Sequence, residues 1–417
     1  MKILFINNFF SEYGGTETVM YEQAVKLREK GHEVLFFATD KKPFLEKEYE
    51  FSSYFPKFTN YRSKKVLLNI FNIIKPFYNF EAQRKLNKFL KVTKPDVIHC
   101  HNIYYHLTPS ILKVCKKNNI PVVMTINDTR LICPAGTLLQ EGKIYCDEEL
   151  CSSYKNPFYC VLYECKNGKF LQSLIVAVEA YFVKKFKFYN AVSAFVCPSM
   201  ALLELAKRSG FEKKKLRLLH NFIPDSYILN KHIYTQQDYF LYAGRISEEK
   251  GVNDLILAFE KLPDIPLRIA GSGPEEIELR LYCEQKQLKN IQFIGSLNKE
   301  ELTEQYQNCI ALLQPSVWFE TFGMSILEAF ACGKPVIAND RGAISELVER
   351  RVTGLLLHSH NTDLLEQYIR LLWNDKEFAR QMGRNARKKA ENYSSENHIN
   401  NLLEIYESVI KAETFFN

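Results

Sequence analysis

The chain has 417 residues, 46% of them hydrophobic and 25% charged, and a formal net charge of +7 at pH 7. This composition excludes a disordered or fibrous protein, and the length suits two domains of roughly 200 residues each. The chain lacks an uninterrupted apolar run of about 18 residues, and its apolar start is too short for a secretory signal, so we expect a cytoplasmic protein without a membrane span.

The first half of the chain alternates apolar strands with helical segments. A helix is expected from Thr16, after Gly14 and Gly15, to about Lys30, with Gly31 ending it. Strands are expected at residues 2–8, 32–39, 96–102, 120–127, 194–199 and 217–223. Repeated strand–helix–strand units with apolar strands predict a parallel sheet covered by helices.

A second series of the same kind follows a polar stretch at residues 224–238. Strands are expected at 238–245, 266–273, 291–297, 310–316 and 335–340, and helices at 251–261, 274–287, 299–308, 323–332, 342–349 and 395–412. We predict two domains, residues 1–223 and 239–394, with residues 395–417 packing back on the first. Two facing parallel sheets would bind a ligand between the carboxyl ends of their strands.

Residues 57–94 form a basic and amphipathic segment. Only one acid, Glu81, accompanies ten basic residues: Lys57, Arg62, Lys64, Lys65, Lys75, Arg84, Lys85, Lys88, Lys91 and Lys94. This pattern favours contact with an anionic membrane surface. A solvated helix face over the core is the alternative, and a nucleic acid partner is not expected.

Four of the eleven cysteines are clustered with the spacing C-x4-C-x8-C-x4-C: Cys146, Cys151, Cys160 and Cys165. They could hold a structural zinc ion, remain as independent reduced thiols, or form disulfides. The spacing is looser than that of the usual zinc motifs, and the three alternatives stay open. The isolated cysteines are expected to be small buried hydrophobic residues.

Four glycine-bearing turns, at residues 12–18, 243–251, 270–274 and 320–325, follow predicted strands. Such turns can cradle phosphate with backbone N–H groups, although they also close ordinary strand–helix units. No G-x-G-x-x-G pattern follows the first strand, which disfavours a dinucleotide. In the second turn, Arg245 and Lys250 suit a diphosphate, unless they are a surface pair balanced by neighbouring glutamates.

The stretch ETFGMSILE places Glu320 and Glu328 around a helix that begins near Gly323. Helix starts attract anions, whereas carboxylates accept hydrogen bonds from hydroxyl groups. A ligand with a central diphosphate and hydroxylated rings at both ends, a nucleoside diphosphate sugar, would satisfy all of these groups. The alternative is two surface glutamates at a helix start.

The motifs AGRISEEKG, AGSGP, FIGSL and ETFGMSILEAFACGKPVIAND resemble those of the retaining glycosyltransferases of family 4, also called glycosyl transferases group 1. Their E-x7-E signature is met by Glu320 and Glu328, and the resemblance covers nearly the whole chain. It implies the α/β GT-B fold, in which two Rossmann-like domains face a central cleft. It also implies a transfer that retains the anomeric configuration and requires no metal or other cofactor.

The resemblance implies roles for individual residues. Arg245 and Lys250 would neutralise the diphosphate, and Glu320 would contact the donor sugar. Glu328 would hold the ribose hydroxyls. The remaining donor-binding positions would be Gly15, Gly271, Gly273, Phe322, Gly323, Met324 and Ser325.

One position departs from the pattern of many relatives, which carry a histidine just before Asp128 where this chain has Asn127. Asparagine cannot titrate, so a proton-carrying role is lost there. His101, at the end of a neighbouring strand, could supply a polar contact instead, or could simply position a loop. Residues 133–169 resemble an insertion on the acceptor side of some members.

We therefore expect a transferase that moves a sugar from a nucleoside diphosphate sugar to a glycan or polyprenyl-linked glycan, in cell-surface polysaccharide synthesis and in peripheral contact with the inner membrane face. Two alternatives remain: a catalytically idle protein that binds nucleotide sugars or glycans, and a nucleotide-sugar epimerase or phosphorylase of the same fold.

Overall fold

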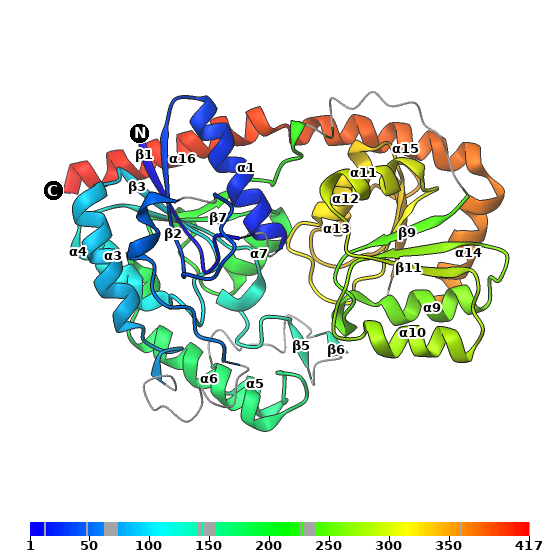
Figure 1. The fold of residues 1–417 in the computed structure, drawn as a ribbon, viewed down its shortest axis with the longest axis horizontal. Coiled ribbons are helices and arrows are strands. Elements are labelled where there is room, and N and C mark those ends of the chain that lie inside the picture. Colours follow the sequence, from blue (N-terminus) through cyan, green and yellow to red (C-terminus); the bar gives the residue numbers. More distant parts are fainter. Residues whose placement is uncertain are drawn as a thin grey trace.

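The computed structural model describes residues 1–11, 14–46, 49–61, 74–140, 144–145, 156–225, 227, 238–358 and 361–416. Within these ranges the chain forms two α/β units, each built on a six-stranded parallel sheet flanked by helices (Figure 1). The expected α/β class with two parallel sheets is confirmed. No helix in the described ranges combines the length and the apolar character that a membrane crossing requires.

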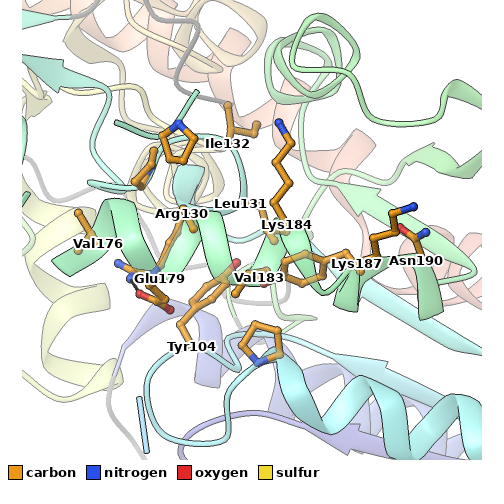
Figure 2. A pocket seen from close by; sticks show the side chains of 15 residues that line it. Tyr104, Arg130, Leu131, Ile132, Val176, Glu179, Val183, Lys184, Lys187 and Asn190 are labelled. Carbon is orange, nitrogen blue, oxygen red and sulfur yellow. Dashed lines mark hydrogen bonds and ion pairs between the residues drawn. The ribbon is translucent and has the colours of Figure 1, made fainter. Parts of the chain in front are cut away.

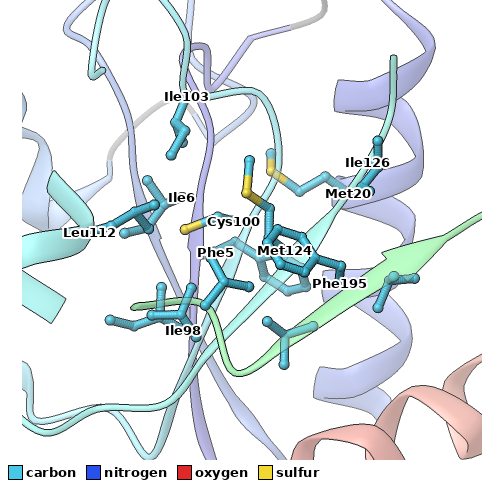
Figure 3. Close-up of a cluster of buried hydrophobic side chains, with 14 of the residues drawn as sticks. Phe5, Ile6, Met20, Ile98, Cys100, Ile103, Leu112, Met124, Ile126 and Phe195 are labelled. Atoms are coloured by element: carbon cyan, nitrogen blue, oxygen red, sulfur yellow. The ribbon is translucent and has the colours of Figure 1, made fainter. Parts of the chain in front are cut away.

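The first sheet has the strand order β2-β1-β3-β4-β7-β8. Its strands are β1 (Lys2–Ile6), β2 (Glu33–Phe37), β3 (Val97–Cys100), β4 (Val122–Thr125), β7 (Ala194–Cys197) and β8 (Leu216–Leu218). Nearly every residue of the four inner strands is buried, because helices cover both faces of a parallel sheet. Figure 3 shows the resulting core, in which Phe5, Ile98, Met124 and Phe195 of the sheet lie close to Met20 of the first helix.

The helices of the first unit are α1 (Gly15–Glu29), α3 (Phe80–Thr93), α4 (Leu112–Lys117), α5 (Tyr159–Leu162), α6 (Phe170–Lys185) and α7 (Met200–Arg208). A small hairpin, β5 (Leu139–Gln140) and β6 (Ile144–Tyr145), lies between α4 and α5 in the sequence.

The second sheet has the order β11-β10-β9-β12-β13-β14. Its strands are β9 (Phe240–Ala243), β10 (Leu267–Ala270), β11 (Ile291–Gly295), β12 (Leu312–Gln314), β13 (Val336–Asn339) and β14 (Gly354–Leu357). Its helices are α9 (Val252–Glu260), α10 (Glu276–Gln285), α11 (Lys299–Asn308), α12 (Met324–Ala331), α13 (Ile344–Leu347), α14 (Thr362–Asn374) and α15 (Lys376–Ala390).

Most predicted elements are a few residues shorter than expected, and two of them are shorter for an identifiable reason. The strand predicted at 217–223 ends at Leu218, because the chain then leaves the sheet for the second unit, where the Ile223 N–H bonds to the Tyr393 carbonyl at 2.9 Å. The helix predicted at 342–349 is reduced to α13, because the Glu349 N–H bonds to the Thr353 hydroxyl in the turn that leads into β14.

The last helix, α16 (Ser395–Phe416), returns to the first unit and packs on α1 and β4 (Figure 1). Its buried residues Ile399, Leu402 and Tyr406 belong to the core of the first sheet. The Tyr406 hydroxyl lies 2.7 Å from Nδ1 of His99, and His398 lies 2.8 Å from the Gln23 amide. The chain therefore crosses between the units twice.

Candidate active site

A cavity of about 460 Å³ lies between the two units, at the carboxyl ends of their strands. Its wall is formed by residues that follow β1, β4 and β7 in the first unit and β9 and β12 in the second. The strand order reverses between β1 and β3 and between β9 and β12, and open parallel sheets bind ligands at such reversals. The predicted site residues on its wall are Gly15, Asn127, Arg245, Lys250, Glu320, Phe322, Gly323, Met324, Ser325 and Glu328.

Glu320 is a buried carboxylate that three side chains approach. Its Oε1 lies 2.6 Å from Lys250 Nζ and accepts hydrogen bonds from Trp318 Nε1 at 2.8 Å and Gln314 Nε2 at 3.2 Å. Burial alone would raise the pKa of Glu320, but the charge and hydrogen bond of Lys250, with bonds from Ser316 and Trp318, hold that pKa below its ordinary value. Glu320 is therefore ionised at neutral pH and is a weak proton acceptor.

Lys250 lies in the turn between β9 and α9, with its Nζ 4.5 Å from the centroid of the Trp318 ring. The aromatic face and the Glu320 carboxylate together fix the ammonium group in the cavity wall. An ammonium group has three donors, so Lys250 can keep its bond to Glu320 and still donate to a bound anion.

Arg245 supplies a second cation in the same turn. Its backbone is held by the Tyr242 hydroxyl, which donates to the Arg245 carbonyl at 2.7 Å. Its side chain is exposed, and no described residue forms an ion pair with it. The guanidinium is thus free to bind a ligand phosphate with two parallel hydrogen bonds.

The N-terminus of α12 faces the cavity. Gly323 precedes the helix with φ 101°, a left-handed conformation that favours glycine, and no described side chain caps the helix. The first turn contains no acidic residue, and Met324 and Ser325 line the cavity. Uncapped N–H groups and the helix dipole suit this turn to binding an anion.

Glu328 lies about one turn into α12 and also lines the cavity. The Tyr306 hydroxyl donates to its Oε2 at 3.0 Å. Burial raises the pKa of Glu328 to about 7, because the Tyr306 bond and the charge of Lys299 only partly offset the loss of hydration. The two glutamates therefore differ in environment: one is ion-paired, and the other titrates near neutral pH.

Gly271 and Gly273 were predicted to bind the donor, but they are not among the residues that line the cavity. A Cβ on Gly271 would lie 1.9 Å from the Gly244 carbonyl oxygen, and one on Gly273 would lie 2.0 Å from that of Ile246. Only glycine allows this turn to pack directly against the Gly244–Arg245 turn. The packing gives both glycines a supporting role in this turn, and their contact with the donor stays a prediction.

On the acceptor side, Asn127 is the predicted residue that reaches the cavity. Its Nδ2 lies 3.3 Å from Nδ1 of His101, which is fully buried behind it and does not line the cavity. Burial lowers the pKa of His101 to about 3, so its ring is neutral. Asp128 also lies off the cavity wall, where its carboxylate accepts a bond from the Arg130 N–H at 2.9 Å. Both residues therefore position the loop that carries Asn127.

The cavity residues that were not predicted from the sequence include Trp318, Gln314 and Thr321. Thr321 donates through its hydroxyl to the Asn127 carbonyl at 2.9 Å and so joins the two units across the cavity. Trp318 lies two residues before Glu320, the first residue of the ETFGMSILE stretch, and this nearness to the signature was the available signal. The partnership of Gln314 with Glu320 depends on the bend after β12 and has no local sequence signal.

A second cavity, of about 370 Å³, lies inside the first unit beneath α6 (Figure 2). Val176 and Val183 of α6 face Leu131 and Ile132 across it. At one side the Arg130 guanidinium pairs with the buried Glu179 carboxylate at 2.5 Å. This pair fixes α6 to the loop that carries Asn127, three residues before Arg130.

The clustered cysteines are only partly described. Cys146 and Cys151 lie outside the described residues, and Cys160 and Cys165 are buried against the start of α6. Within the described ranges no group of three or more potential ligands could hold a metal ion. The choice between zinc, reduced thiols and disulfides stays a prediction.

Of the basic segment 57–94, residues 62–73 also lie outside the described residues. Two of its lysines have structural partners: Lys75 pairs with Glu81 at 3.2 Å, and Lys85 donates to the Phe55 carbonyl at 2.5 Å. Arg84, Lys88 and Lys91 lie on α3, whose opposite face is buried in the core. Part of the segment therefore serves the fold of the first unit.

Comparison with known proteins identifies the family. The profile described as Glycosyltransferase Family 4 matches residues 13–227, half of the chain. The chain belongs to glycosyltransferase family 4. The profile described as Glycosyl transferases group 1 matches the second half, residues 228–389, which holds Arg245, Lys250 and both signature glutamates.

Individual relatives are more distant. The chain is 24% identical to N-acetyl-alpha-D-glucosaminyl L-malate synthase of Bacillus anthracis over 99% of both chains. It is 28% identical to O-antigen chain mannosyltransferase C of Escherichia coli over 42% of this chain and 48% of the relative. The crystal structure of Anabaena HepE in complex with UDP-glucose superposes with a TM-score of 0.67 and 18% identity, over 98% of this chain and the whole of HepE, which shows the shared GT-B fold.

Proposed function

We propose that this family 4 glycosyltransferase moves a sugar from a nucleoside diphosphate sugar to a glycan or polyprenyl-linked glycan, with retention of configuration and without a metal ion. The observation that carries the proposal is the Lys250–Glu320 pair at 2.6 Å, which lies in one cavity with the uncapped start of α12. This arrangement supplies positive charge where the diphosphate leaves and a fixed acceptor for the hydroxyls of the sugar.

The donor would lie along α12. Its diphosphate would bind the Arg245 guanidinium, the Lys250 ammonium and the first N–H groups of the helix. Breaking the bond between the anomeric carbon and the diphosphate builds negative charge on the leaving group, and fixed donors stabilise that charge most. Two protein cations would take the place that a divalent metal ion has in other phosphate-transfer sites.

Glu320 and Glu328 would hold the two ends of the donor. The ionised Glu320 would accept hydrogen bonds from the sugar, and Glu328 would accept them from the ribose. The low pKa of Glu320 and the non-titrating amide of Asn127 leave neither as a proton acceptor. The proton of the acceptor hydroxyl would therefore pass to the departing diphosphate as the new glycosidic bond forms.

The names of the relatives guide the choice of substrates. HepE was crystallised with UDP-glucose, and the E. coli relative is named for O-antigen synthesis. We therefore propose a UDP-sugar as the first donor to test and a cell-surface polysaccharide or its lipid-linked precursor as the acceptor class. The protein would act in the cytoplasm, at the inner face of the membrane where such precursors are assembled.

Asn127 favours one alternative, a protein that binds nucleotide sugars without transferring them, because it replaces a residue that can titrate. A single experiment separates the two functions. Purified protein is incubated with radiolabelled UDP- and GDP-sugars, a lipid-linked glycan extract and EDTA, and both bound donor and labelled glycan are measured. Transfer that is lost in Glu320→Gln but kept in the exposed-residue control Glu300→Gln supports the enzyme. Tight donor binding without any labelled glycan would establish the idle protein instead.

A further inference from the structure

Helix α6 has an unusual composition for a helix at the surface. Apolar residues occupy all sides of its 16 residues, FLQSLIVAVEAYFVKK. Helices that are hydrophobic all round are normally enclosed by protein or by lipid. Each side of α6 therefore needs a partner.

The inner side of α6 has one. Ser173, Val176 and Ala177 are buried against the first unit, and Val183 lines the second cavity (Figure 2). The Arg130–Glu179 ion pair locks this side in place. The inner side thus accounts for about half of the apolar residues.

The outer side has no described partner. Leu171 is 66% exposed and Ile175 is 47% exposed, and both lie on the same side as Val178 and Phe186. Helix α5 extends this surface, since Leu162 is 69% exposed and the ring of Phe158 lies 5.9 Å from that of Tyr181. We call these exposed residues of α5 and α6 the α5–α6 surface: Phe158, Tyr159, Leu162, Tyr163, Phe170, Leu171, Ile175, Val178, Tyr181 and Phe186. Scattered exposed apolar residues are normal, but a contiguous patch marks an interaction surface.

Positive charge accompanies the α5–α6 surface. Residues 156–190 contain five lysines, Lys166, Lys169, Lys184, Lys185 and Lys187, and two acids, Glu164 and Glu179. Of these acids, Glu179 is buried and paired with Arg130. The lysines lie at both ends of α6, and Lys113 adds an ammonium group 5.2 Å from the Phe186 ring. Lys166 donates inward to the Ala135 carbonyl, and the exposed charges of residues 156–190 are the four other lysines, so that the charge this stretch presents outward is mainly positive.

We propose that the α5–α6 surface seats the protein on an anionic membrane, with its apolar and aromatic side chains in the interface and its lysines on lipid phosphates. This inference deepens the lipid-linked part of the proposed function, on which it rests. Amphipathic surfaces with Phe, Tyr and Leu on one side and lysines at the edge bind at the boundary between headgroups and acyl chains. A protein partner would place acidic or neutral residues opposite these lysines, and the test below separates the two.

The position of the surface fits a membrane-bound acceptor. Figure 1 shows α5 and α6 at the edge of the first unit farthest from α16, with the β5–β6 hairpin beside them. Through the Arg130–Glu179 pair, α6 is tied to the loop that brings Asn127 to the catalytic cavity. Of the part of segment 57–94 that the structure describes, Tyr78 lies near the end of α6, with its ring 6.1 Å from that of the buried Phe188. Among the described residues, the membrane contact is assigned to α5 and α6.

The apolar contribution is tested by vesicle sedimentation of the full chain. The vesicles contain 70% phosphatidylcholine and 30% phosphatidylglycerol. The double variant Leu171→Glu/Ile175→Glu should bind at least tenfold more weakly than the unaltered protein. The matched control is Ile277→Glu/Leu281→Glu, which places the same change with the same spacing on exposed residues of α10 in the second unit. The control should bind as the unaltered protein does.

The charge contribution is tested in the same assay. Lys169→Glu/Lys185→Glu should weaken binding by more than tenfold, since each lysine near an anionic surface contributes about fivefold. Lys289→Glu/Lys388→Glu alters net charge equally at exposed sites of the second unit and should weaken binding much less. Raising the salt concentration should weaken binding of the unaltered protein, and vesicles of phosphatidylcholine alone should bind poorly.

Three outcomes would overturn the proposal: no binding of the unaltered protein to the anionic vesicles, equal binding of the α6 variant and its control, or a dimer that dissociates only in Leu171→Glu/Ile175→Glu. The last would make the surface an interface between copies of the chain. UDP-sugar binding, measured in solution without vesicles, should be unchanged in all four variants. If the unaltered protein does not bind UDP-sugars, the proposed function is contradicted. If it binds UDP-sugars but not the vesicles, only the assignment of the α5–α6 surface to the membrane is contradicted.

Discussion

The cavity between the two units has two walls, which we assign to the donor and to the acceptor, and they are built in different ways. The donor wall comes from the second unit, where Arg245, Lys250, Glu320 and Glu328 lie within 84 residues on the ends of neighbouring strands and one helix. The acceptor wall comes from the first unit, where Asn127 reaches the cavity and its support comes from buried residues that are distant in the sequence. In the proposed function, donor chemistry depends on polar groups at helix and strand ends, and acceptor selection depends on packing and loops. Variants should therefore separate the two walls.

The largest effect is expected at the Lys250–Glu320 pair. Glu320→Gln should lower turnover by about 10²- to 10³-fold, because it removes a fixed charge next to the reacting centre. Donor affinity should change little, since the diphosphate contacts remain. Single-turnover transfer and equilibrium binding of the UDP-sugar measure the two quantities.

A double-mutant cycle sharpens this test. Lys250→Met leaves a buried carboxylate without its counter-charge and should lower the free energy of unfolding by about 3 kcal/mol. Adding Glu320→Gln should restore much of that stability but no activity, because the two residues are coupled. Additive losses of stability in urea titrations would mean that the pair does not act as a unit.

The donor wall was largely readable from the sequence, and the acceptor wall was not. Glu320, Gly323 and Glu328 lie within nine residues at one strand–helix junction, so their relative positions follow from local geometry. The supporting role of Gly271 and Gly273 depends on a contact with another loop, which no local pattern reveals. For the same reason His101 was placed near the cleft but not behind Asn127, and the exposed side of α6 could not be told from a buried one.

Glu328 offers a pH test of the donor wall. Its folded pKa is about 7, above the ordinary 4.5, so its carboxyl is mostly neutral at pH 6 and mostly ionised at pH 8. If the ionised form holds the ribose, affinity for a UDP-sugar should rise by up to about tenfold across this range. A UDP-sugar is the right ligand because its diphosphate does not itself titrate there. Glu328→Gln should weaken binding and abolish this pH dependence, with turnover of bound donor less affected than in Glu320→Gln.

The same pKa predicts a change in stability. Because the pKa of Glu328 is raised in the folded state, its ionisation is less favourable there than in the unfolded chain. The free energy of unfolding should therefore fall as pH rises from about 4.5 through about 7. Glu328→Gln should therefore raise the melting temperature of the ligand-free protein at pH 8 more than at pH 5.

Equal effects of the Glu320 and Glu328 variants on donor affinity would contradict the assignment of the two glutamates to opposite ends of the donor.

Variants of two glycines distinguish a residue that supports a loop from one that contacts the ligand. Gly273→Ala should lower the free energy of unfolding by about 2 kcal/mol, because its Cβ would lie 2.0 Å from the Ile246 carbonyl and the loops must move apart. Donor affinity should fall with it as Arg245 is displaced. Gly15→Ala meets no atom within 4 Å and should leave stability unchanged, while any loss of donor affinity reports close approach of the phosphate. Thermal melts with and without UDP-sugar distinguish the two results.

The smallest effect on the donor is expected at Asn127, and it is the sharpest test of the acceptor wall. Asn127→Ala removes an amide that reaches the cavity but leaves Arg245, Lys250 and both glutamates in place. The KM for the acceptor should rise severalfold, and donor affinity and slow hydrolysis of the donor by water should stay within about twofold, the size of changes at sites without a direct contact. Thr321→Val isolates the bond between the units, because it removes the hydroxyl that donates to the Asn127 carbonyl and keeps the side-chain volume. If Asn127→Ala instead lowered donor affinity as strongly as Glu328→Gln, the division of the cavity into donor and acceptor walls would be wrong, and Asn127 would belong to the donor site.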